Sequence, residues 1–356
     1  MSDPIRIALD AMGGDHGPGV VVPAAALALQ ARSDLRFRIF GDSALIRPLL
    51  SAHPALNAVS EIIHTDVAIS NTEKPSAALR KGKNSSMRLA IDDVSAGLSQ
   101  CIVSAGNTGA LMATAKLVFR CLPGVDRPAI ATVLPSITGR TVTLDLGANI
   151  TCDAENLVQF ALLGACFART VLNIDKPTVG ILNIGSEDMK GHETLHDAAA
   201  VLQGITFPGR YIGFVEGNDI TAGTVDVVVT DGFTGNVALK TAEGVGKFIS
   251  KVLKEELGGS FMGKLGYLIA SKAMGRARHR MDHRVYNGAM FLGLSEVCIK
   301  SHGGADAFAF SRAIIVGADM VHNRFNTMVA DQIGKLAEQE TFVSMPIPSP
   351  IDVNAD

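Results

Sequence analysis

Four short segments of the chain combine glycine with hydroxyl, amide and charged side chains, and each follows a run of apolar residues. They are DAMGGDH at 10–16, SAGNTG at 104–109, NIGSEDMKG at 183–191 and DGFTGN at 231–236. Glycine exposes backbone N–H groups, and a helix that begins at such a loop adds the positive end of its dipole. The segments could therefore hold a phosphate or a similar anion.

The segment 104–109 has the strongest anion-binding pattern, because a glycine loop leads from an apparent strand directly into a helix. The residues expected to hold phosphate there are Ser104, Gly106, Asn107, Thr108 and Gly109. The spacing is neither a Walker A motif nor the G-x-G-x-x-G of dinucleotide sites. The alternative is a plain helix N-cap made by Asn107 or Thr108.

The segment 231–236 places a carboxylate, a hydroxyl and an amide around one helix start, with a cation one turn further on. This pattern predicts that Asp231, Asn236 and Lys240 form a catalytic group. The alternative is that Asp231 only caps the helix. Another helix start carries Lys83 and two serine hydroxyls, and a capping role is the alternative there too.

The histidines and cysteines do not have the spacing of a metal site. His16, His302 and the pair His279 and His283 lack the partner residues that a metal ion needs. Five cysteines are spread along the chain without a C-x-x-C pair, which indicates reduced thiols and no zinc. We expect neither a metal ion nor a cofactor.

Short β-branched runs alternate with helical patterns along most of the chain. The strands and helices that these patterns predict must position the four glycine segments. The expected strands are 5–10, 36–41, 101–104, 129–134, 141–146, 178–183, 211–215 and 225–230. The expected helices between them are 20–31, 85–97, 108–119, 153–171 and 193–202. The alternation is typical of a mostly parallel sheet covered on both faces, in which ligands bind beyond the carboxyl ends of the strands. We therefore expect the glycine segments to converge on one edge of the sheet.

From residue 231 onward the pattern is almost entirely helical. The main helices expected are 241–257, 261–274 and 306–338. The sequence Gly-Gly-Ser at 258–260 separates the first two, which predicts a helical hairpin over about 241–275. We expect residues 1–340 to form one α/β domain that includes this hairpin, and 341–356 to be a disordered tail.

The composition excludes several classes of protein. The 356 residues carry 32 Lys and Arg against 35 Asp and Glu, and the net charge of -3 does not suit a nucleic-acid binder. Hydrophobic residues make up 47% of the chain, which is enough for a sizeable core. No apolar run reaches the ~18 residues of a membrane span, and we expect no signal peptide before the first strand. We expect a cytoplasmic protein whose membrane contact, if any, is peripheral.

The sequence resembles, over nearly its whole length, the bacterial phosphate acyltransferases that use acyl carrier protein at the start of phospholipid synthesis. Eight motifs carry the resemblance, in order along the chain: DAMGGDH at 10–16, KNSSM at 83–87, SAGNTGALM at 104–112, DRPA at 126–129, DLGAN at 145–149, NIG at 183–185, TDGFTGNV at 230–237 and KSHG at 300–303. One departure is Thr151, where the family more often has an aspartate. Short-chain phosphate transacetylases are similar in a D-x3-GN-x3-K pattern, which here runs from Asp231 to Lys240.

The resemblance implies a three-layer α/β/α fold like that of isopropylmalate dehydrogenase, and a homodimer. It implies transfer of a long-chain fatty acyl group from acyl carrier protein to inorganic phosphate, and delivery of the acyl phosphate to a membrane-bound glycerol-3-phosphate acyltransferase. Together with the glycine segments, it indicates a binding set for phosphate and acyl-pantetheine: Asp10, Gly13, Gly14, His16, Lys83, Ser104, Gly106, Asn107, Thr108, Gly109, Asn149, Asn183, Gly185, Gly232, Thr234 and Gly235.

The implied reaction needs a held phosphate and a fixed donor for the oxyanion that develops on the thioester carbonyl. Asn236, Asn149 and Lys190 are the candidates for that donor, and Lys190 joins the catalytic group for this reason. Phosphate is already anionic at neutral pH, so Asp231 would orient the nucleophile as much as deprotonate it. Covalent catalysis by cysteine is weakly motivated because no cysteine lies in a glycine loop; Cys101 and Cys152 are expected in the core.

The turn of the predicted hairpin displays large apolar side chains beside basic ones. We expect Phe261, Met262 and Leu265 to insert shallowly into an anionic membrane surface on the inner face of the cell membrane. Lys254, Lys264 and Lys272 would be attracted to the anionic lipid. Burial of the same side chains in a dimer interface is the alternative.

Other functions remain open from the sequence. One is a short-chain transacetylase-like enzyme acting on acyl-CoA, and another is a non-catalytic scaffold at a membrane surface. A nicotinamide-dependent dehydrogenase on the same fold is disfavoured because the chain has no arginine cluster and no paired metal-binding aspartates.

Overall fold

The computed structural model describes residues 4–280 and 282–339, and one mixed sheet runs through them. Its strands are β1 (Ile5–Asp10), β2 (Leu35–Gly41), β3 (Ser60–His64), β4 (Cys101–Ser104), β5 (Ala129–Pro135), β6 (Arg140–Leu144), β7 (Thr178–Leu182), β8 (Arg210–Val215), β9 (Val227–Val229), β10 (Ala289–Leu292) and β11 (Val297–Lys300). They pair in the order β3-β2-β1-β4-β11-β10-β5-β6-β9-β7-β8.

Helices cover both faces of this sheet. They are α1 (Pro18–Ala31), α2 (Ser43–Ser51), α3 (Pro54–Asn57), α4 (Pro75–Lys81), α5 (Ser86–Ser95), α6 (Thr108–Phe119), α7 (Ala154–Leu172), α8 (Glu193–Gly204), α9 (Gly217–Ala222), α10 (Gly232–Gly258), α11 (Phe261–Arg280), α12 (Ala307–His322) and α13 (Phe325–Ala337), with a 3-10 turn η1 (His283–Tyr286). Apolar residues of α1, α7, α12 and α13 pack on one face, and those of α5 and α6 on the other. The predicted α/β class with a three-layer arrangement is confirmed.

The two halves of the sheet run in opposite directions. β1, β2, β3, β4 and β11 are mutually parallel, and so are β6, β7, β8 and β9. A short hairpin joins β5 to β6, and the two strands pair antiparallel. The carboxyl ends of the two groups of strands therefore face opposite edges of the sheet. The expectation that all the glycine segments leave one edge is wrong for this reason.

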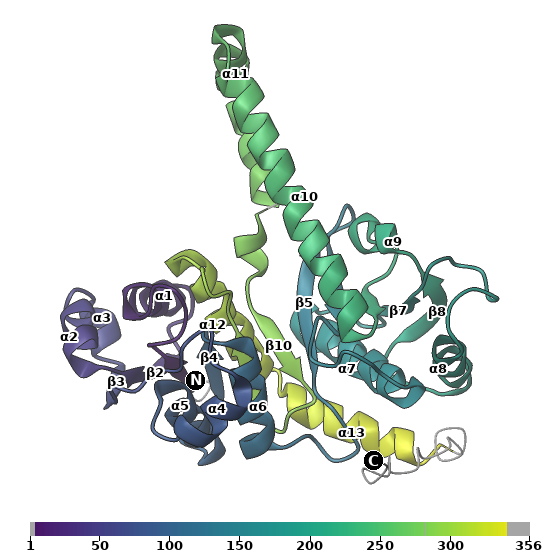
Figure 1. Ribbon diagram of the computed structural model, residues 1–356, viewed down its shortest axis with the longest axis horizontal. Helices are drawn as coiled ribbons and strands as arrows, with labels where there is room; N and C mark the ends of the chain where they lie inside the picture. Colours follow the sequence, from purple (N-terminus) through teal and green to yellow (C-terminus); the bar gives the residue numbers. More distant parts are fainter. Residues whose placement is uncertain (1–3, 281, 340–356) are drawn as a thin grey trace.

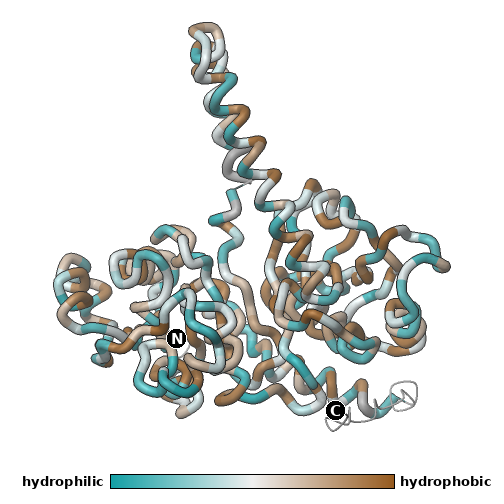
Figure 2. Tube along the Cα trace, in the orientation of Figure 1, coloured by the Kyte–Doolittle hydropathy of each residue, from teal (hydrophilic) through white to brown (hydrophobic). Residues whose placement is uncertain are grey.

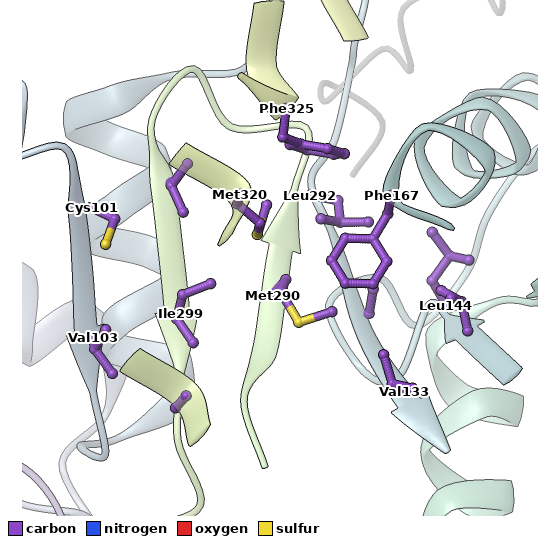
Figure 3. Packing of buried hydrophobic residues seen from close by; sticks show 14 of the residues in the cluster. Cys101, Val103, Val133, Leu144, Phe167, Met290, Leu292, Ile299, Met320 and Phe325 are labelled. Atoms are coloured by element: carbon purple, nitrogen blue, oxygen red, sulfur yellow. The ribbon is translucent and has the colours of Figure 1, made fainter. Parts of the chain in front are cut away.

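The largest buried cluster extends along one face of the sheet, and in its central part α7 and α13 pack over β10 (Figure 3). The rings of Phe167 and Phe325 meet edge to face, with their centroids 6.2 Å apart. Met290 and Leu292 project from β10 into the same cluster. Because these side chains come from distant parts of the chain, their burial joins the two halves of the molecule.

The predicted helical hairpin is present and stands clear of the rest of the molecule (Figure 1). It consists of α10 and α11, and apolar and polar residues alternate along both helices (Figure 2). α10 begins nine residues before the predicted start at 241, so its first turns pack on the body and only the remainder projects. In the part of the chain that the structure describes, no helix is both long enough and apolar enough to cross a bilayer.

The edge strand β3 and the short helices α2, α3, α4 and α9 were not among the predicted elements. Further departures concern the C-terminal third. The residues before and after the turn at 293–296 form β10 and β11, where no strand was expected. The helix expected over 306–338 is two helices, because the chain turns at Arg324, whose φ of 52° is left-handed. The segment 341–356, expected to be disordered, lies outside the described residues, as do the side chains of His279 and His283.

Candidate active site

Three neighbouring parallel strands end in polar side chains that lie in one row. Asp10 closes β1, Ser104 closes β4 and Lys300 closes β11, and the pairing places all three in register. Alternation along each strand turns them to the face that α5 and α6 cover, since Ala8, Ile102 and Cys298 pack there. All three residues are buried.

The carboxylate of Asp10 accepts hydrogen bonds from several surrounding segments. It accepts hydrogen bonds from Ser86 Oγ and Ser104 Oγ, both at 2.6 Å, and from the backbone N–H groups of Met12 and Gly13. Burial raises the pKa of Asp10, and these hydrogen bonds oppose that rise. The N–H groups of Met12 and Gly13 therefore already donate to Asp10 and are not free to bind a phosphate.

Gly13 lies where the first and second glycine loops touch. A Cβ on Gly13 would come within 2.6 Å of Asp10 Oδ2 and 2.7 Å of Gly106 N. The Gly106 N–H in turn donates to Ser104 Oγ at 3.0 Å. Only glycine allows this approach, so the loops at 10–16 and 104–109 are brought together as the sequence suggested.

The N terminus of α6 keeps free N–H groups. Asn107 caps the helix by accepting a hydrogen bond from the Ala110 N–H at 3.0 Å, and its amide donates to the carbonyls of Asn71 and Glu73, each at 2.9 Å. The capping interpretation of Asn107 is therefore confirmed. Among the described residues, nothing pairs with the N–H groups of Thr108 and Gly109. These two groups, at the positive end of α6, are available to an anion.

The other group of loops follows β6, β9 and β7, whose ends are also in register. Leu144 pairs with Val229, and Val229 with Ile181. The buried carboxylate of Asp145 accepts the N–H groups of Ile130, Gly147, Ala148 and Asn149 and the side-chain amide of Asn149. Burial raises the pKa of Asp145. Asn149 also donates to Pro128 O at 2.9 Å, so its amide is already engaged.

The start of α10 rests directly on this loop. Asp231 caps α10 by accepting both the N–H and the hydroxyl of Thr234, each at 2.8 Å, and the Gly232 N–H donates to Asn149 O at 2.7 Å. A Cβ on Gly235 would lie 1.9 Å from Asp145 O, so glycine is required for this contact.

The side-chain amide of Asn236 has no hydrogen-bond partner within the described residues and lies beside Gly147. A Cβ on that glycine would be 3.6 Å from Asn236 Cβ. Of the two asparagines expected to donate to an oxyanion, Asn236 alone is therefore free to do so.

Lys190 and Asn183 lie on the neighbouring loop after β7. Lys190 is half exposed and forms an ion pair with Glu187 at 2.9 Å. Asn183 closes the loop, because its amide donates to Lys190 O at 2.7 Å and its oxygen accepts the Ile184 N–H. Gly185 lies against the Lys190 side chain.

α10 connects the two groups of loops. It starts at the edge of the second group, and one turn beyond Asn236 the ammonium of Lys240 pairs with Glu243 at 3.0 Å. Lys240 also interacts electrostatically with Lys300 and His302 of the first group. Lys300 and His302 of the first group therefore lie within electrostatic range of the helix that begins at the second group.

The remaining predicted residues occupy the rim. Gly14 packs against Ala105 and Gly303, whereas His16 and Lys83 are exposed. Cys152 is half-buried beside the Asp145 loop, and burial raises its pKa to about 12, which does not suit a nucleophile. Cys101 is buried, as expected.

The sequence analysis did not single out Ser86, Asp145 or Lys300 as site residues. Ser86 was noted only as one of two hydroxyls at a helix start, and Asp145 and Lys300 stand in motifs that were quoted only for their resemblance. A signal was available for Lys300, because a lysine directly after the apolar run Val-Cys-Ile is unusual at the end of a buried strand.

Comparisons with known proteins show what the chain is similar to. A family model described as "Fatty acid synthesis protein" matches residues 5–328. The phosphate acyltransferase of Rhodospirillum centenum is 55% identical over 336 residues, which cover 94% of this chain and 95% of that protein. The phosphate acyltransferase of Rhodospirillum rubrum is 53% identical over 345 residues, 97% of this chain and 99% of that protein.

Solved structures of low sequence identity share the fold. The EutD phosphotransacetylase from Staphylococcus aureus superposes with a TM-score of 0.59 at 17% identity, covering 89% of this chain and 94% of that one. A phosphotransacetylase from Streptococcus pyogenes gives 0.58 at 19% identity, covering 90% and 94%. These two likenesses establish the fold alone.

Proposed function

Because the chain belongs to the fatty acid synthesis protein family of phosphate acyltransferases, we propose that it moves a long-chain fatty acyl group from acyl carrier protein to inorganic phosphate. Membership makes it a phosphate acyltransferase of fatty acid and phospholipid synthesis. The identity of the acyl donor, the length of the acyl chain and the roles of individual residues are our proposal.

The proposal of a long-chain acyl donor is supported by an apolar rim, a set of exposed apolar side chains on the second group of loops. Each of five large side chains on these loops and the start of α10 is more than half exposed: Ile150, Ile184, Met189, Phe233 and Val237. An acetyl group needs no such surface, whereas a fatty acyl chain gains from every apolar contact. All of these side chains except Ile150 stand on the same segments as Lys190 and Asn236.

The proposed reaction uses the free groups of both sets of loops. The N–H groups of Thr108 and Gly109 hold phosphate, whose oxygen attacks the thioester carbonyl carbon. The C–O bond forms, the C–S bond breaks, and the pantetheine sulfur leaves as a thiolate that takes a proton from solvent. The free amide of Asn236 supports its role as donor to the carbonyl oxygen as negative charge develops there. Asp231 remains the candidate for orienting the nucleophile, and Lys240 and Lys190 for stabilising charge.

The test is a comparison of donors with purified protein and inorganic phosphate. Acyl phosphate is trapped with hydroxylamine and measured with palmitoyl-acyl carrier protein, palmitoyl-CoA and acetyl-CoA. We expect the highest kcat/KM with the long-chain acyl carrier protein. Faster turnover of acetyl-CoA would identify a short-chain transacetylase instead, and no turnover with any donor would leave only the scaffold interpretation.

We also propose that the hairpin serves two partners. Val245, Phe248, Ile249 and Val252 recur at helical spacing on the shaft of α10, and all are exposed. This stripe suits the matching helix of a second copy in a homodimer. Phe261 and Met262 are 81% and 71% exposed at the tip, beyond the stripe.

The tip therefore suits shallow insertion into an anionic bilayer. A cytoplasmic enzyme held at the inner face of the cell membrane would release its acyl phosphate near a membrane-bound glycerol-3-phosphate acyltransferase. We propose this membrane-bound acyltransferase as the partner that consumes the acyl phosphate.

A further inference from the structure

Lys300 is the only lysine or arginine that is buried within the described part of the chain, with 9% of its surface exposed. It ends β11, next to Ser104 of β4 and two strands away from Asp10, and it points to the face on which α6 lies. Nothing in the reaction proposed above uses it. A buried ammonium is costly unless its charge is compensated, so its presence needs a physical reason.

The hydrogen bonds of Lys300 are made to neutral carbonyls. Its Nζ donates to Ala105 O at 3.2 Å and to Ser301 O. Among the described residues, no carboxylate lies within ion-pair distance of Nζ. Ala105 directly precedes Gly106, so Lys300 holds the glycine loop from the β11 side while Asp10, through Ser104, holds it from the β1 side.

The charges around this loop conflict with binding of an anion unless a cation is present. Asp10 is buried next to the loop, and a phosphate at the N terminus of α6 would meet its negative charge. The helix dipole contributes only about half a unit of positive charge. A full positive charge on the same face, in register with Asp10, offsets the carboxylate.

We propose that Lys300 is a positioning residue for the phosphate nucleophile: its ammonium fixes the Ala105 carbonyl ahead of α6 and supplies the charge that lets a phosphate dianion bind near Asp10. The inference rests on the proposed function, because it names the group that makes the 104–109 loop a phosphate site. The ligand class is an inorganic phosphate or a close tetrahedral analogue.

The proposal predicts a pH dependence whose sign follows from burial. Burial lowers the pKa of Lys300 to about 8. The ammonium is therefore present below that pH and is lost as the pH rises through it, so phosphate affinity falls on the alkaline side. The charged or titratable groups that face Lys300 are Asp10, Asp15, Cys298, Lys240 and His302.

The experiment measures binding of inorganic phosphate to the full chain by calorimetry without any acyl donor, together with KM for each substrate. Lys300→Met is expected to weaken phosphate binding on the order of tenfold or more, since it removes a full positive charge that contacts the loop ahead of α6. KM for the acyl donor should stay within about twofold. The matched control is Lys335→Met on α13, an exposed lysine that should change neither constant.

Lys300→Arg keeps the charge at all accessible pH values. We expect it to restore phosphate binding and to abolish the loss of affinity above pH 8, whereas phosphate's own ionisation is common to both proteins. Equal phosphate affinity in wild type and Lys300→Met, with both folded by circular dichroism, would overturn the proposal. The proposal would also be overturned if wild type and Lys300→Arg lost phosphate affinity equally above pH 8. This second test does not depend on whether Lys300→Met folds.

These outcomes are separable from failure of the proposed function. If wild type forms acyl phosphate but Lys300→Met binds phosphate normally, only the role of Lys300 is wrong. If wild type binds phosphate with the expected dependence on Lys300 but transfers no long acyl group, only the proposed donor is wrong.

Discussion

Replacing Gly13 by alanine tests whether the close approach of the two glycine loops determines phosphate binding. The φ angle of Gly13 is not in the left-handed region, so its backbone accepts alanine. The new Cβ, however, would lie 2.6 Å from Asp10 Oδ2 and 2.7 Å from Gly106 N. Neither neighbour can turn aside, because one is a carboxylate held by four donors and the other is backbone.

The size of the effect follows from these distances. Ordinary contact begins at 3.4 Å, so the loop that carries Gly106 must move by about 0.7 Å. Misplacing a reacting group by about 1 Å can cost about 10²-fold in rate. We therefore expect kcat/KM for phosphate to fall by about 10- to 100-fold, or about 1.4–2.7 kcal/mol. Overpacking costs about 1–3 kcal/mol of unfolding free energy, which leaves a domain of ordinary stability folded.

The assay varies phosphate at saturating acyl donor, and thermal unfolding is followed in parallel. Gly19→Ala is the matched control, because a Cβ on this glycine of α1 meets nothing within 4 Å. It should leave the kinetics unchanged and add about 0.5–1 kcal/mol of stability. Normal phosphate saturation by Gly13→Ala, with an unchanged melting temperature, would refute the reasoning.

Three further predictions concern the cap of α10, the core and the hairpin. Asp231→Asn retains an acceptor for the Thr234 N–H, so we expect an unchanged melting temperature and a fall in kcat of about 10²-fold; an unchanged kcat would reduce Asp231 to a helix cap. Phe167→Ala removes a fully buried ring and should lower the unfolding free energy by about 3–5 kcal/mol in urea denaturation, a result that a loss below 1 kcal/mol would contradict. The double variant Phe261→Ser with Leu265→Ser should lose flotation with anionic vesicles while the dimer and its activity in solution persist; unchanged flotation, or dissociation into monomers, would exclude tip insertion.

Most of the sheet could be predicted because its strands are apolar runs separated by recognisable helices. The reversal of direction could have been predicted as well. Only six residues separate the expected strands 129–134 and 141–146, and a parallel crossover needs about twice as many. β10 and β11 were harder to find, since each has four residues and β10 follows directly on a long helical region.

The candidate site shows where sequence patterns stop being informative. Glycine segments marked the loops at the strand ends, but the pattern does not reveal which polar groups already have hydrogen-bond partners. The amides of Asn149 and Asn107 are both engaged, whereas that of Asn236 is free, and only three-dimensional pairing separates them. The row of Asp10, Ser104 and Lys300 depends on strand register, which joins residues almost 300 positions apart.

The length of α10 sets the distance between the candidate site and the hairpin tip. From Asn236 to the end of the helix at Gly258, a rise of 1.5 Å per residue gives about 33 Å. A bilayer's hydrocarbon core is about 30 Å thick for two leaflets, so one extended acyl chain covers about 15 Å. If the tip inserts as proposed and the hairpin stands perpendicular to the membrane, a product still held beside Asn236 could not touch the lipid. Delivery would then require either release of the acyl phosphate from the site or a steep tilt of the hairpin toward the membrane surface.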